Sequence, residues 1–484
     1  MKLRQLLQGI PTLEVRADLE MEIPAVSYDS RKTAKGDLFV AMTGYETDGH
    51  KFIPSAAERG AACVLCERAP EGVEIPYVRV ASTRKALADV GCNYYGHPAD
   101  TMTMVGVTGT NGKTSTTYLL KDVLEKAVGA KVGLIGTNQN MIGSEVLHTE
   151  RTTPESFELQ GLLRQMADAG CTHVVMEVSS HALYLERVRG IRYAVGIFTN
   201  LTQDHLDFHG TMEAYCDAKA ILFCRCEVGV CNADDPWCAR LLKDATCRVV
   251  TFGEHGGDLR AENIRLCADG IAFTAREGEN SVNIAVAIPG GFMVYNTLGV
   301  LAAAKALGIS YEESARVLAA TAHVKGRVEP VPTDGDYTIL IDYAHTPDAL
   351  ENVLTAVRGF ARGRVVALFG CGGDRDRTKR PQMGRIAAEK ADFVVVTSDN
   401  PRTEEPGAII QDILAGMAHT DTPYVVVENR VEAIHYAIDH ARSGDVIVLA
   451  GKGHEDYQVI GHEKHHLDER EVVAEYLRQR AHMK

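Results

Sequence analysis

The sequence predicts an α/β protein of three domains, and three observations support this prediction. The chain has 484 residues, which is enough for about three domains. Apolar strand-like runs alternate with helical stretches, a pattern typical of mostly parallel sheets covered by helices. A composition of 45% hydrophobic and 24% charged residues is that of an ordinary globular protein. We expect a small N-terminal α/β domain (1–100), a central domain with a parallel sheet (101–327) and a C-terminal Rossmann-like domain with a doubly wound sheet (328–484).

The first segment contains short strands and one helix. Strands are predicted at Gly36–Met42, Ala61–Glu67 and Tyr77–Ala81, because these runs are apolar and bounded by turn residues. A helix is predicted at Thr83–Tyr95, followed by a linker at Gly96–Asp100.

The central segment opens with a phosphate-binding pattern, "VGVTGTNGKTSTTYLL". Thr101–Val107 is predicted to be a buried strand, and a helix is predicted from Thr114 onward. The Gly-rich turn between them would direct backbone N–H groups toward an anion. Lys113 adds a positive charge, and the Thr114 hydroxyl can bind Mg²⁺. The standard pattern has Gly where this chain has Val107, but strand, turn and helix occur in the required order, which predicts a P-loop-type ATPase domain.

Three further strands of the central segment are predicted to end in polar residues. They lie in "CTHVVMEVSSH", "AVGIFTNLTQDHLDFHG" and "GVCNADDP". The stretch "EAYCDAKAILF" between the last two is predicted to be a helix that carries Lys219.

The last segment has the clearest alternation. "YTILIDYAHTP", "GRVVALFGCGGDRDR", "DFVVVTSDNPR" and "GDVIVLAGKGHEDYQ" each begin as a strand and end in polar residues, and helices such as Ala408–Met417 and Val431–His440 lie between them. Ligands of such sheets bind beyond the carboxyl ends of the strands. The four polar stretches stand at those ends, so we expect this domain to face a small polar ligand.

Charge and composition exclude several classes of protein. A formal net charge of −14 argues against broad nucleic-acid binding, so an anionic ligand must meet local clusters of Arg and Lys. No apolar run approaches the roughly 20 residues of a membrane-spanning helix. Residues 1–15 are too polar for a signal peptide. Cys63 and Cys66 lie in an apolar run, and we expect all twelve cysteines to be reduced thiols of a cytoplasmic protein.

Four motifs, "TGTNGKT", "EVSSH", "DYAHTPDAL" and "DNPR", occur in the order found in a known family. The chain resembles the Mur ligases, the ATP-dependent amide-forming enzymes of peptidoglycan precursor synthesis, from Tyr28 in "YDSRKTAKGDLFVA" to Gln458 in "GKGHEDYQ". The resemblance implies that ATP phosphorylates a substrate carboxylate and that an amine then attacks the acyl phosphate. Positioning and charge neutralisation would carry most of the catalysis. It also implies a UDP-N-acetylmuramoyl dipeptide and an amino acid as substrates, and we expect a monomer.

The resemblance implies catalytic and cofactor roles for residues of the central segment. The ATP phosphates would be cradled by Gly109, Thr110, Asn111, Gly112, Lys113, Thr114 and Ser115. Mg²⁺ would be bound by Thr114, Glu177, His205 and Lys219. The matching lysine of this family is carbamylated, which converts an ammonium that cannot bind a metal into a carboxylate. The rest of the nucleotide would be bound by Asn296 at the adenine, Asp342 at the ribose, and Arg327.

The remaining implied residues bind substrate. Tyr28 and Ser30 would hold the nucleotide sugar, and its peptide end would reach Thr152, Thr153, Ser179 and Arg187. The amino-acid pocket would comprise Arg375, Asp399, Asn400, Pro401, Arg402, Gly451 and Glu455.

The "DNPR" motif predicts that the amino acid is meso-diaminopimelate. This molecule is lysine with a carboxylate added at its far end, and Arg402 can bind that group through two parallel hydrogen bonds. Asp399 and Asn400 could receive the neighbouring ammonium. The alternative is that Arg402 is a turn residue paired with Glu404 or Glu405, since weak surface pairs of this kind are common.

Other functions remain open at this stage. One is a Mur ligase that adds lysine, and another is an enzyme similar to folylpolyglutamate synthetase, which would not need "DNPR" or "DSR…GDLFVA". A third is a nucleotide-gated switch or a transporter ATPase, which would hydrolyse ATP without a small amine. Phosphate release that depends on substrate distinguishes these possibilities.

Overall fold

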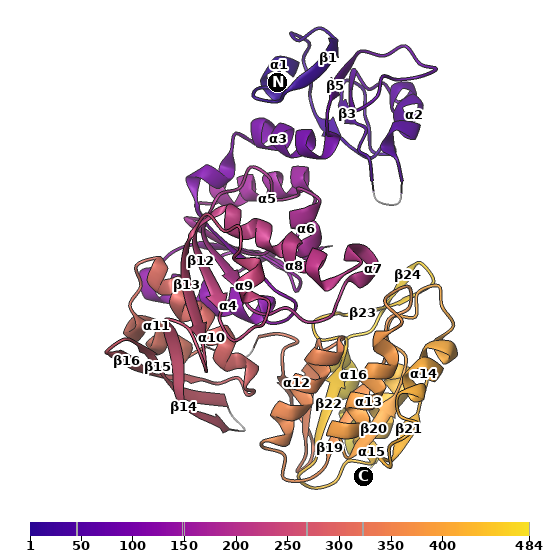
Figure 1. The fold of residues 1–484 in the computed structure, drawn as a ribbon. Coiled ribbons are helices and arrows are strands. Elements are labelled where there is room, and N and C mark those ends of the chain that lie inside the picture. The colour runs from indigo at the N-terminus through magenta and orange to yellow at the C-terminus, as the bar shows by residue number, and fades with distance from the viewer. Residues whose placement is uncertain (45–46, 148, 150, 268–269, 322–323, 484) are drawn as a thin grey trace. The chain divides into compact units, whose positions relative to one another are not determined.

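The computed structural model describes residues 1–484 except 45–46, 148, 150, 268–269, 322–323 and 484 (Figure 1). The chain divides into two compact units. The first comprises 1–106, 130–194 and 224–227, and the second comprises 107–129, 195–223 and 228–484. Three large sheets, of 5, 11 and 6 strands, are mostly parallel and covered by helices, which confirms the predicted α/β class. None of the helices formed by the described residues is long and apolar enough to cross a membrane.

The first sheet consists of short strands, and helices cover both of its faces. Its order is β1 (Thr12–Arg16), β5 (Tyr77–Val80), β4 (Cys63–Cys66), β3 (Leu38–Val40) and β2 (Val26–Ser27), with only the β1–β5 pair antiparallel. One face packs with α1 (Leu3–Leu6) and α3 (Thr83–Tyr95), and the other with α2 (Ile53–Glu58). Cys63 and Cys66 are buried in the cores on the two faces of this sheet, and burial raises the pKa of both thiols to about 12.

The second sheet has antiparallel strands at both edges. Its order is β16 (Asn280–Val286), β15 (Gly270–Glu277), β14 (Leu259–Cys267), β13 (Arg248–Gly253), β12 (Cys226–Asn232), β11 (Tyr193–Phe198), β6 (Thr103–Thr108), β10 (His173–Glu177), β7 (Val132–Ile135), β8 (Asn140–Ile142) and β9 (Glu145–Leu147). β14, β15 and β16 pair antiparallel, as do β7, β8 and β9. The prediction of a parallel sheet therefore missed both edges, because successive strands there are separated by only a few residues of sequence, too few for a crossover helix.

Helices connect the other strands of this region. They are α4 (Lys113–Val128), α5 (Ser156–Asp168), α6 (Ser180–Tyr184), α7 (Leu206–His209), α8 (Met212–Ala220), α9 (Cys238–Leu241), α10 (Phe292–Ala306) and α11 (Tyr311–Leu318). The strand expected through "AVGIFTNLTQDHLDFHG" ends at Phe198, and its polar half forms a loop and α7. At the start of this loop the Thr199 hydroxyl donates to the carbonyl of Asn111, 2.6 Å away, which ties the loop to the phosphate-loop segment.

The third sheet is doubly wound, as predicted. Its order is β17 (Glu329–Val331), β18 (Thr338–Asp342), β22 (Val446–Ala450), β19 (Val365–Phe369), β20 (Phe393–Val396) and β21 (Tyr424–Val426), and only β17 is antiparallel. Alternate strand residues face α12 (Pro347–Arg358), α13 (Lys379–Lys390) and α14 (Pro406–Ala415) on one side. The other side packs against α15 (Arg430–Asp439) and α16 (Glu469–Met483). A hairpin of β23 (Tyr457–Ile460) and β24 (Glu463–His466) follows β22.

Candidate active site

The phosphate-loop pattern forms a turn that only glycine can make. Gly109 and Gly112 have φ values of +149° and +84°. A Cβ atom on Gly109 would lie 1.9 Å from Thr199 Oγ1, and one on Gly112 would lie 2.3 Å from Asn296 Oδ1. Val107 lies inside β6 and not in the turn, so the standard glycine is not required at that position.

Two cations converge on the start of α4. Lys113 is its first residue, and its Nζ donates to the carbonyls of Gly109 (2.9 Å) and Thr110 (2.8 Å). Arg327 donates from Nη2 to Thr114 Oγ1 at 2.8 Å. These positive charges add to the partial positive charge of a helix N-terminus, so the loop is built to bind an anion such as a phosphate group.

Lys219 has a buried side-chain amine beside the phosphate loop. Its side chain is 1% exposed, and Nζ donates to Gly109 O at 2.9 Å and lies 4.5 Å from the centre of the Tyr215 ring. No carboxylate among the described residues forms an ion pair with it. Burial, and then the charge of Lys113, hold the pKa of Lys219 well below its ordinary value. A lysine in this environment tends toward the neutral, nucleophilic amine.

His205 and its neighbour Asp204 precede α7. His205 has a left-handed backbone, with φ of +53°, and its Nε2 lies 3.4 Å from Asp204 Oδ2. Burial raises the pKa of Asp204, but His205, His345 and Lys379 outweigh it and keep the pKa below its ordinary value. Asp204 is therefore an anion in a cationic environment.

Glu177, the remaining predicted metal ligand, belongs to the first compact unit. It ends β10 and is buried. Its Oε1 accepts from the Thr137 backbone N–H at 3.0 Å, and its Oε2 accepts from the Thr137 hydroxyl at 2.8 Å. The Thr152 hydroxyl lies 3.0 Å from that of Thr137. The carboxylate is thus held by neutral donors in a fixed orientation.

The other predicted substrate residues of this unit lie around the same strand end. Thr153 donates from Oγ1 to Glu177 O at 2.9 Å and lies 3.4 Å from Ser179 Oγ. Arg187 donates to Glu155 Oε2 at 3.2 Å and to Thr153 O at 3.4 Å. The structure therefore brings Thr152, Thr153, Ser179 and Arg187 together.

Tyr28 and Ser30 lie after β2. The Tyr28 hydroxyl donates to Glu158 on α5, and burial together with Glu158 raises the pKa of Tyr28 above its ordinary value. Ser30 is buried. Their role toward a nucleotide sugar remains a prediction.

Two of the three predicted nucleotide contacts, Asp342 and Asn296, are buried and held in place. Asp342 ends β18, and its two oxygens accept from the backbone N–H groups of Val328 and Ala344, both at 2.8 Å. Burial raises its pKa, against the opposing charge of Arg327. Asn296 lies against Gly112, and its amide donates to Met293 Sδ at 3.6 Å. The structure therefore places Asn296 beside the phosphate loop, and its contact with adenine remains a prediction.

The four polar stretches of the C-terminal segment meet at one cavity of about 210 Å³. It lies where the carboxyl ends of β18, β19, β20 and β22 reach the same edge of the sheet. Predicted residues that line it are His205, Arg375, Asp399, Asn400, Arg402, Gly451 and Glu455, and it is also lined by Asp204, Asp207, Tyr343, His345, Gly372, Asp376 and Lys379.

Arg375 and Arg402 line this cavity, and neither guanidinium forms an ion pair with a carboxylate of the described residues. Arg402 donates from Nη1 to Gly373 O at 2.8 Å, and Arg375 donates to Asp374 O at 2.8 Å. Within the described residues neither forms an ion pair. Glu404 instead pairs with Arg380 at 2.7 Å, so its proposed pairing with Arg402 is wrong. Burial, and then Arg375, lower the pKa of Arg402, as expected when two cations share a site.

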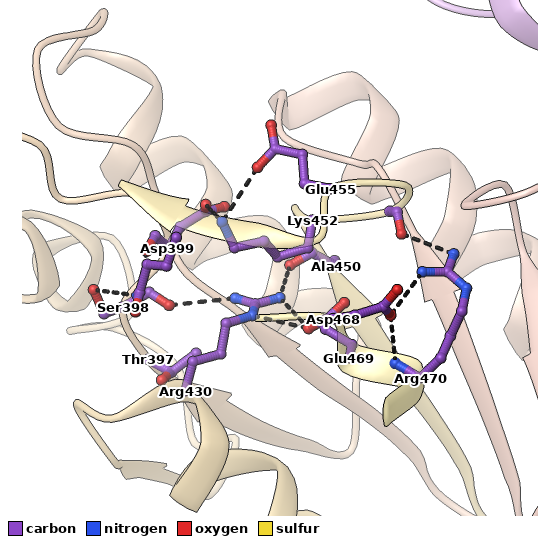
Figure 2. A network of polar contacts seen from close by, with 12 residues as sticks. Thr397, Ser398, Asp399, Arg430, Ala450, Lys452, Glu455, Asp468, Glu469 and Arg470 are labelled. Atoms are coloured by element: carbon purple, nitrogen blue, oxygen red, sulfur yellow. Dashed lines mark hydrogen bonds and ion pairs between the residues drawn. The ribbon is translucent and has the colours of Figure 1, made fainter. Parts of the chain in front are cut away.

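Opposite charges line another part of the cavity (Figure 2). The fully buried Lys452 lies 3.5 Å from Asp399 Oδ1 and 3.2 Å from Glu455 Oε2. Burial raises the pKa of Asp399, but Lys452 and then Arg430 outweigh it and hold that pKa below its ordinary value. Asn400 accepts from Lys452 Nζ at 2.6 Å and donates to Glu455 at 2.9 Å. Because a carboxylate accepts from a cation more strongly than a neutral amide oxygen does, Asp399 and Glu455 are the better acceptors for a ligand ammonium.

Comparison with known proteins shows which family the chain belongs to. Family models described as "Mur ligase family, catalytic domain", "Mur ligase middle domain" and "Mur ligase, glutamate ligase domain" match residues 22–95, 107–304 and 326–453. A UDP-N-acetylmuramoyl-L-alanyl-D-glutamate–2,6-diaminopimelate ligase of Clostridium tetani is 46% identical, over 99% of both chains. The chain belongs to the Mur ligase family. A relative of the same name from Clostridium acetobutylicum is 47% identical over 99% of this chain and 100% of its own.

Solved structures also support the membership of this chain in the Mur ligase family. A structure named for the same diaminopimelate ligase matches with a TM-score of 0.70 and 30% identity, over 100% of this chain and 99% of its own. MurF from Thermotoga maritima in complex with ADP matches with a TM-score of 0.64 over 95% and 98% of the two chains, but at 20% identity it supports the fold alone.

Sequence reasoning about this Mur ligase missed several residues in the cavity lining and one, Lys452, directly behind it. Asp204 and His345 stand beside recognised motif residues, and their positions after predicted strands were the available signal. Lys379 opens α13, and it gave no local signal. Lys452 stands inside "GKGHEDYQ", where the neighbouring glycines favour a solvent-exposed lysine. Only the structure shows that it is buried beside two carboxylates.

Proposed function

We propose that this Mur ligase joins meso-2,6-diaminopimelate to UDP-N-acetylmuramoyl-L-alanyl-D-glutamate in the cytoplasm, as a monomer, with ATP forming an acyl phosphate on the glutamate carboxylate. The observation that carries the proposal is the cavity in which Arg375 and Arg402 lie free of carboxylates while Asp399 and Glu455 supply negative charge. Diaminopimelate presents a carboxylate beside an ammonium and therefore matches both charges. The relatives named for this reaction support the choice.

In the first half of the reaction, the phosphate loop would bind ATP. Lys113 and Arg327 would neutralise charge on the phosphoryl group as it moves to the carboxylate, and Gly109 and Gly112 would let backbone N–H groups approach it. Preorganised donors of this kind are the main source of catalysis when the reacting groups are all anionic.

The residues also fit Mg²⁺, which would supply further neutralisation of phosphate charge when bound. No group of three His, Cys, Asp or Glu side chains suited to a metal occurs in the described part of the chain. Mg²⁺ needs only one or two protein carboxylates, because it takes other ligands from substrate phosphates and water. Glu177 is a rigidly held carboxylate, and Thr114, His205 and a carbamylated Lys219 would complete the protein's share.

In the second half, the cavity would hold the amino acid. Tyr343 O accepts from His345 Nδ1 at 2.8 Å, so the neutral ring presents Nε2 as an acceptor for an incoming ammonium. Burial, and then Lys379, lower the pKa of His345 to about 4, which keeps the ring neutral at physiological pH. The enzyme would thereby orient an amine without adding a competing positive charge.

The test is phosphate release with the nucleotide dipeptide and a panel of amino acids. We expect release to require ATP, the nucleotide dipeptide and diaminopimelate together, and to stop when EDTA removes Mg²⁺. Release with ATP alone would indicate a switch or transporter ATPase. Release with a folate substrate and glutamate would indicate a folylpolyglutamate synthetase.

Carbamylation of Lys219 makes a separate prediction. Lys219→Ala should lose most of the activity, because the variant lacks the carboxylate that carbon dioxide would form on this buried amine. Added acetate or formate should restore part of it by filling the vacated space. Growth or incubation with ¹³C-bicarbonate should give a carbamate signal in the ¹³C NMR spectrum of the wild type and none in the variant.

Lys219→Arg serves as the matched control, since arginine keeps a cation but cannot be carbamylated. We expect this variant to be as inactive as Lys219→Ala. An active Lys219→Arg variant, or wild-type enzyme that is active without a carbamate signal, would show that the ammonium itself is the working group.

A further inference from the structure

We propose that Arg430 is a positioning residue of the amino-acid cavity, because its guanidinium sets the spacing between the two strand ends that carry Asp399 and Gly451. The inference rests on the proposed function and extends it to a residue outside the cavity lining. Arg430 is the first residue of α15 and is completely buried.

The hydrogen bonds of Arg430 show how it reaches both strand ends (Figure 2). Nη2 donates to Ala450 O at 2.8 Å, and Nη1 donates to Ser398 O in a longer bond of 3.4 Å. Ala450 directly precedes Gly451, and Ser398 directly precedes Asp399. One planar group therefore contacts the backbone immediately before two residues of the cavity.

Glu469 also holds the guanidinium in place. It is the first residue of α16, it is 1% exposed, and its Oε1 lies 2.9 Å from Arg430 Nε and Nη2. Glu469 Oε2 has no hydrogen-bond partner among the described residues. A buried pair of this kind gains little net stability from its charges, so its geometry needs another explanation.

The sheet joins the two strand ends that Arg430 contacts only through an intervening strand. β20, which leads to Ser398, and β22, which ends at Ala450, are separated by β19, so no ladder of hydrogen bonds joins them directly. The two ends still approach closely, since a Cβ atom on Gly451 would lie 2.5 Å from Asp399 Oδ2. A small shift of either end would move the Asp399 carboxylate relative to Gly451 and change the shape of the cavity.

Loss of this contact should therefore weaken binding of the amino acid more than binding of the other substrates. Within the part of the chain that the structure describes, the hydrogen bonds of Arg430 go to Ser398, Ala450 and Glu469. A misplacement of about 1 Å at a binding group can cost up to roughly 100-fold. We expect the KM for diaminopimelate to rise by about 10- to 100-fold, while the KM values for ATP and for the nucleotide dipeptide change less than about 2-fold.

The experiment compares three variants of the full chain. Arg430→Met leaves Glu469 buried and without its partner and is expected to be less stable. The double variant Arg430→Met/Glu469→Met removes both charges, because replacing a whole buried ion pair with apolar groups is often tolerated. Arg364→Met is the matched control. Arg364 pairs with Asp445 at 2.6 Å and donates to His440 O at 2.8 Å, but it lies at the amino ends of the strands of the same sheet, away from the cavity.

Binding of diaminopimelate by calorimetry and the three KM values decide the outcome. The proposal predicts that the double variant keeps a Tm near that of the wild type and raises only the Kd and KM for diaminopimelate. Arg364→Met should lower the Tm and leave the Kd and KM for diaminopimelate unchanged. A folded double variant that binds diaminopimelate as the wild type does would overturn it, as would an equal rise of all three KM values. If the wild-type enzyme binds no diaminopimelate, the proposed function fails instead.

Discussion

Lys113→Ala is expected to abolish acyl-phosphate formation while the protein stays folded. The Lys113 ammonium projects into the phosphate loop and contacts the Gly109 and Thr110 carbonyls, where a phosphate group would lie. Removing one preorganised charge of this kind costs about 10²- to 10³-fold in turnover. Trapping of the acyl phosphate with hydroxylamine, in the absence of amino acid, measures the affected step directly.

The same helix offers a control. Lys126 lies near the other end of α4, where it pairs with Asp122 across the helix surface. Lys126→Ala should keep normal trapping, since exposed pairs of this kind contribute about 0.3–0.5 kcal/mol to stability and nothing to the loop. Near-normal trapping by a folded Lys113→Ala variant would contradict the assignment of the phosphate loop.

The phosphate loop was predictable because its physics is local. A strand, two glycines and a helix start follow each other within a dozen residues or so, and each has its own sequence signal. The departure at Val107 is explained by the structure, since β6 extends through Thr108 and the turn begins only at Gly109. The place of Asn296 against Gly112 was not predictable, because their contact depends on how α10 packs against α4.

The C-terminal cavity was predictable for a different reason. Parallel strands with polar residues after each carboxyl end must bring those residues to one edge, which is where Arg402, Asp399 and Glu455 are found. The supporting charges were not predictable. Arg430 and Glu469 are 39 residues apart, and neither stands in a motif, so only the folded chain shows that they form a buried pair.

The antiparallel edges of the central sheet show another limit of sequence reasoning. β14, β15 and β16 carry alternating patterns of the kind that predicts strands, but the surrounding βα alternation favoured a parallel interpretation. Local patterns indicate that a strand exists. They do not indicate its partner, which depends on contacts between distant residues.

Wild-type enzyme is expected to use diaminopimelate over lysine by about 10⁴-fold in kcat/KM, and Arg402→Ala is expected to remove most of that preference. Lysine would leave the Arg402 guanidinium in the cavity without an anionic partner, and sites built to bind a polar group reject analogues that lack it by about this factor. The backbone of Arg402 is held independently, since its N–H donates to Val459 O at 3.1 Å and its carbonyl accepts from Gly461 N at 2.8 Å. The substitution should therefore remove only the guanidinium.

Which of the two kcat/KM values falls in the Arg402→Ala variant decides this prediction. Arg402→Ala should narrow the preference mainly by losing diaminopimelate, with lysine use nearly unchanged, because the variant loses an attraction and gains no new contact for lysine. Arg377→Ala is the control, on the loop after β19 that also carries Arg375, since Arg377 is exposed and pairs with Asp412 outside the cavity. It should leave both kcat/KM values unchanged. Comparable kcat/KM for lysine and diaminopimelate in the wild type would refute the assignment of the amino acid while leaving the ligase chemistry intact, because the phosphate loop and Glu177 do not depend on which amine attacks.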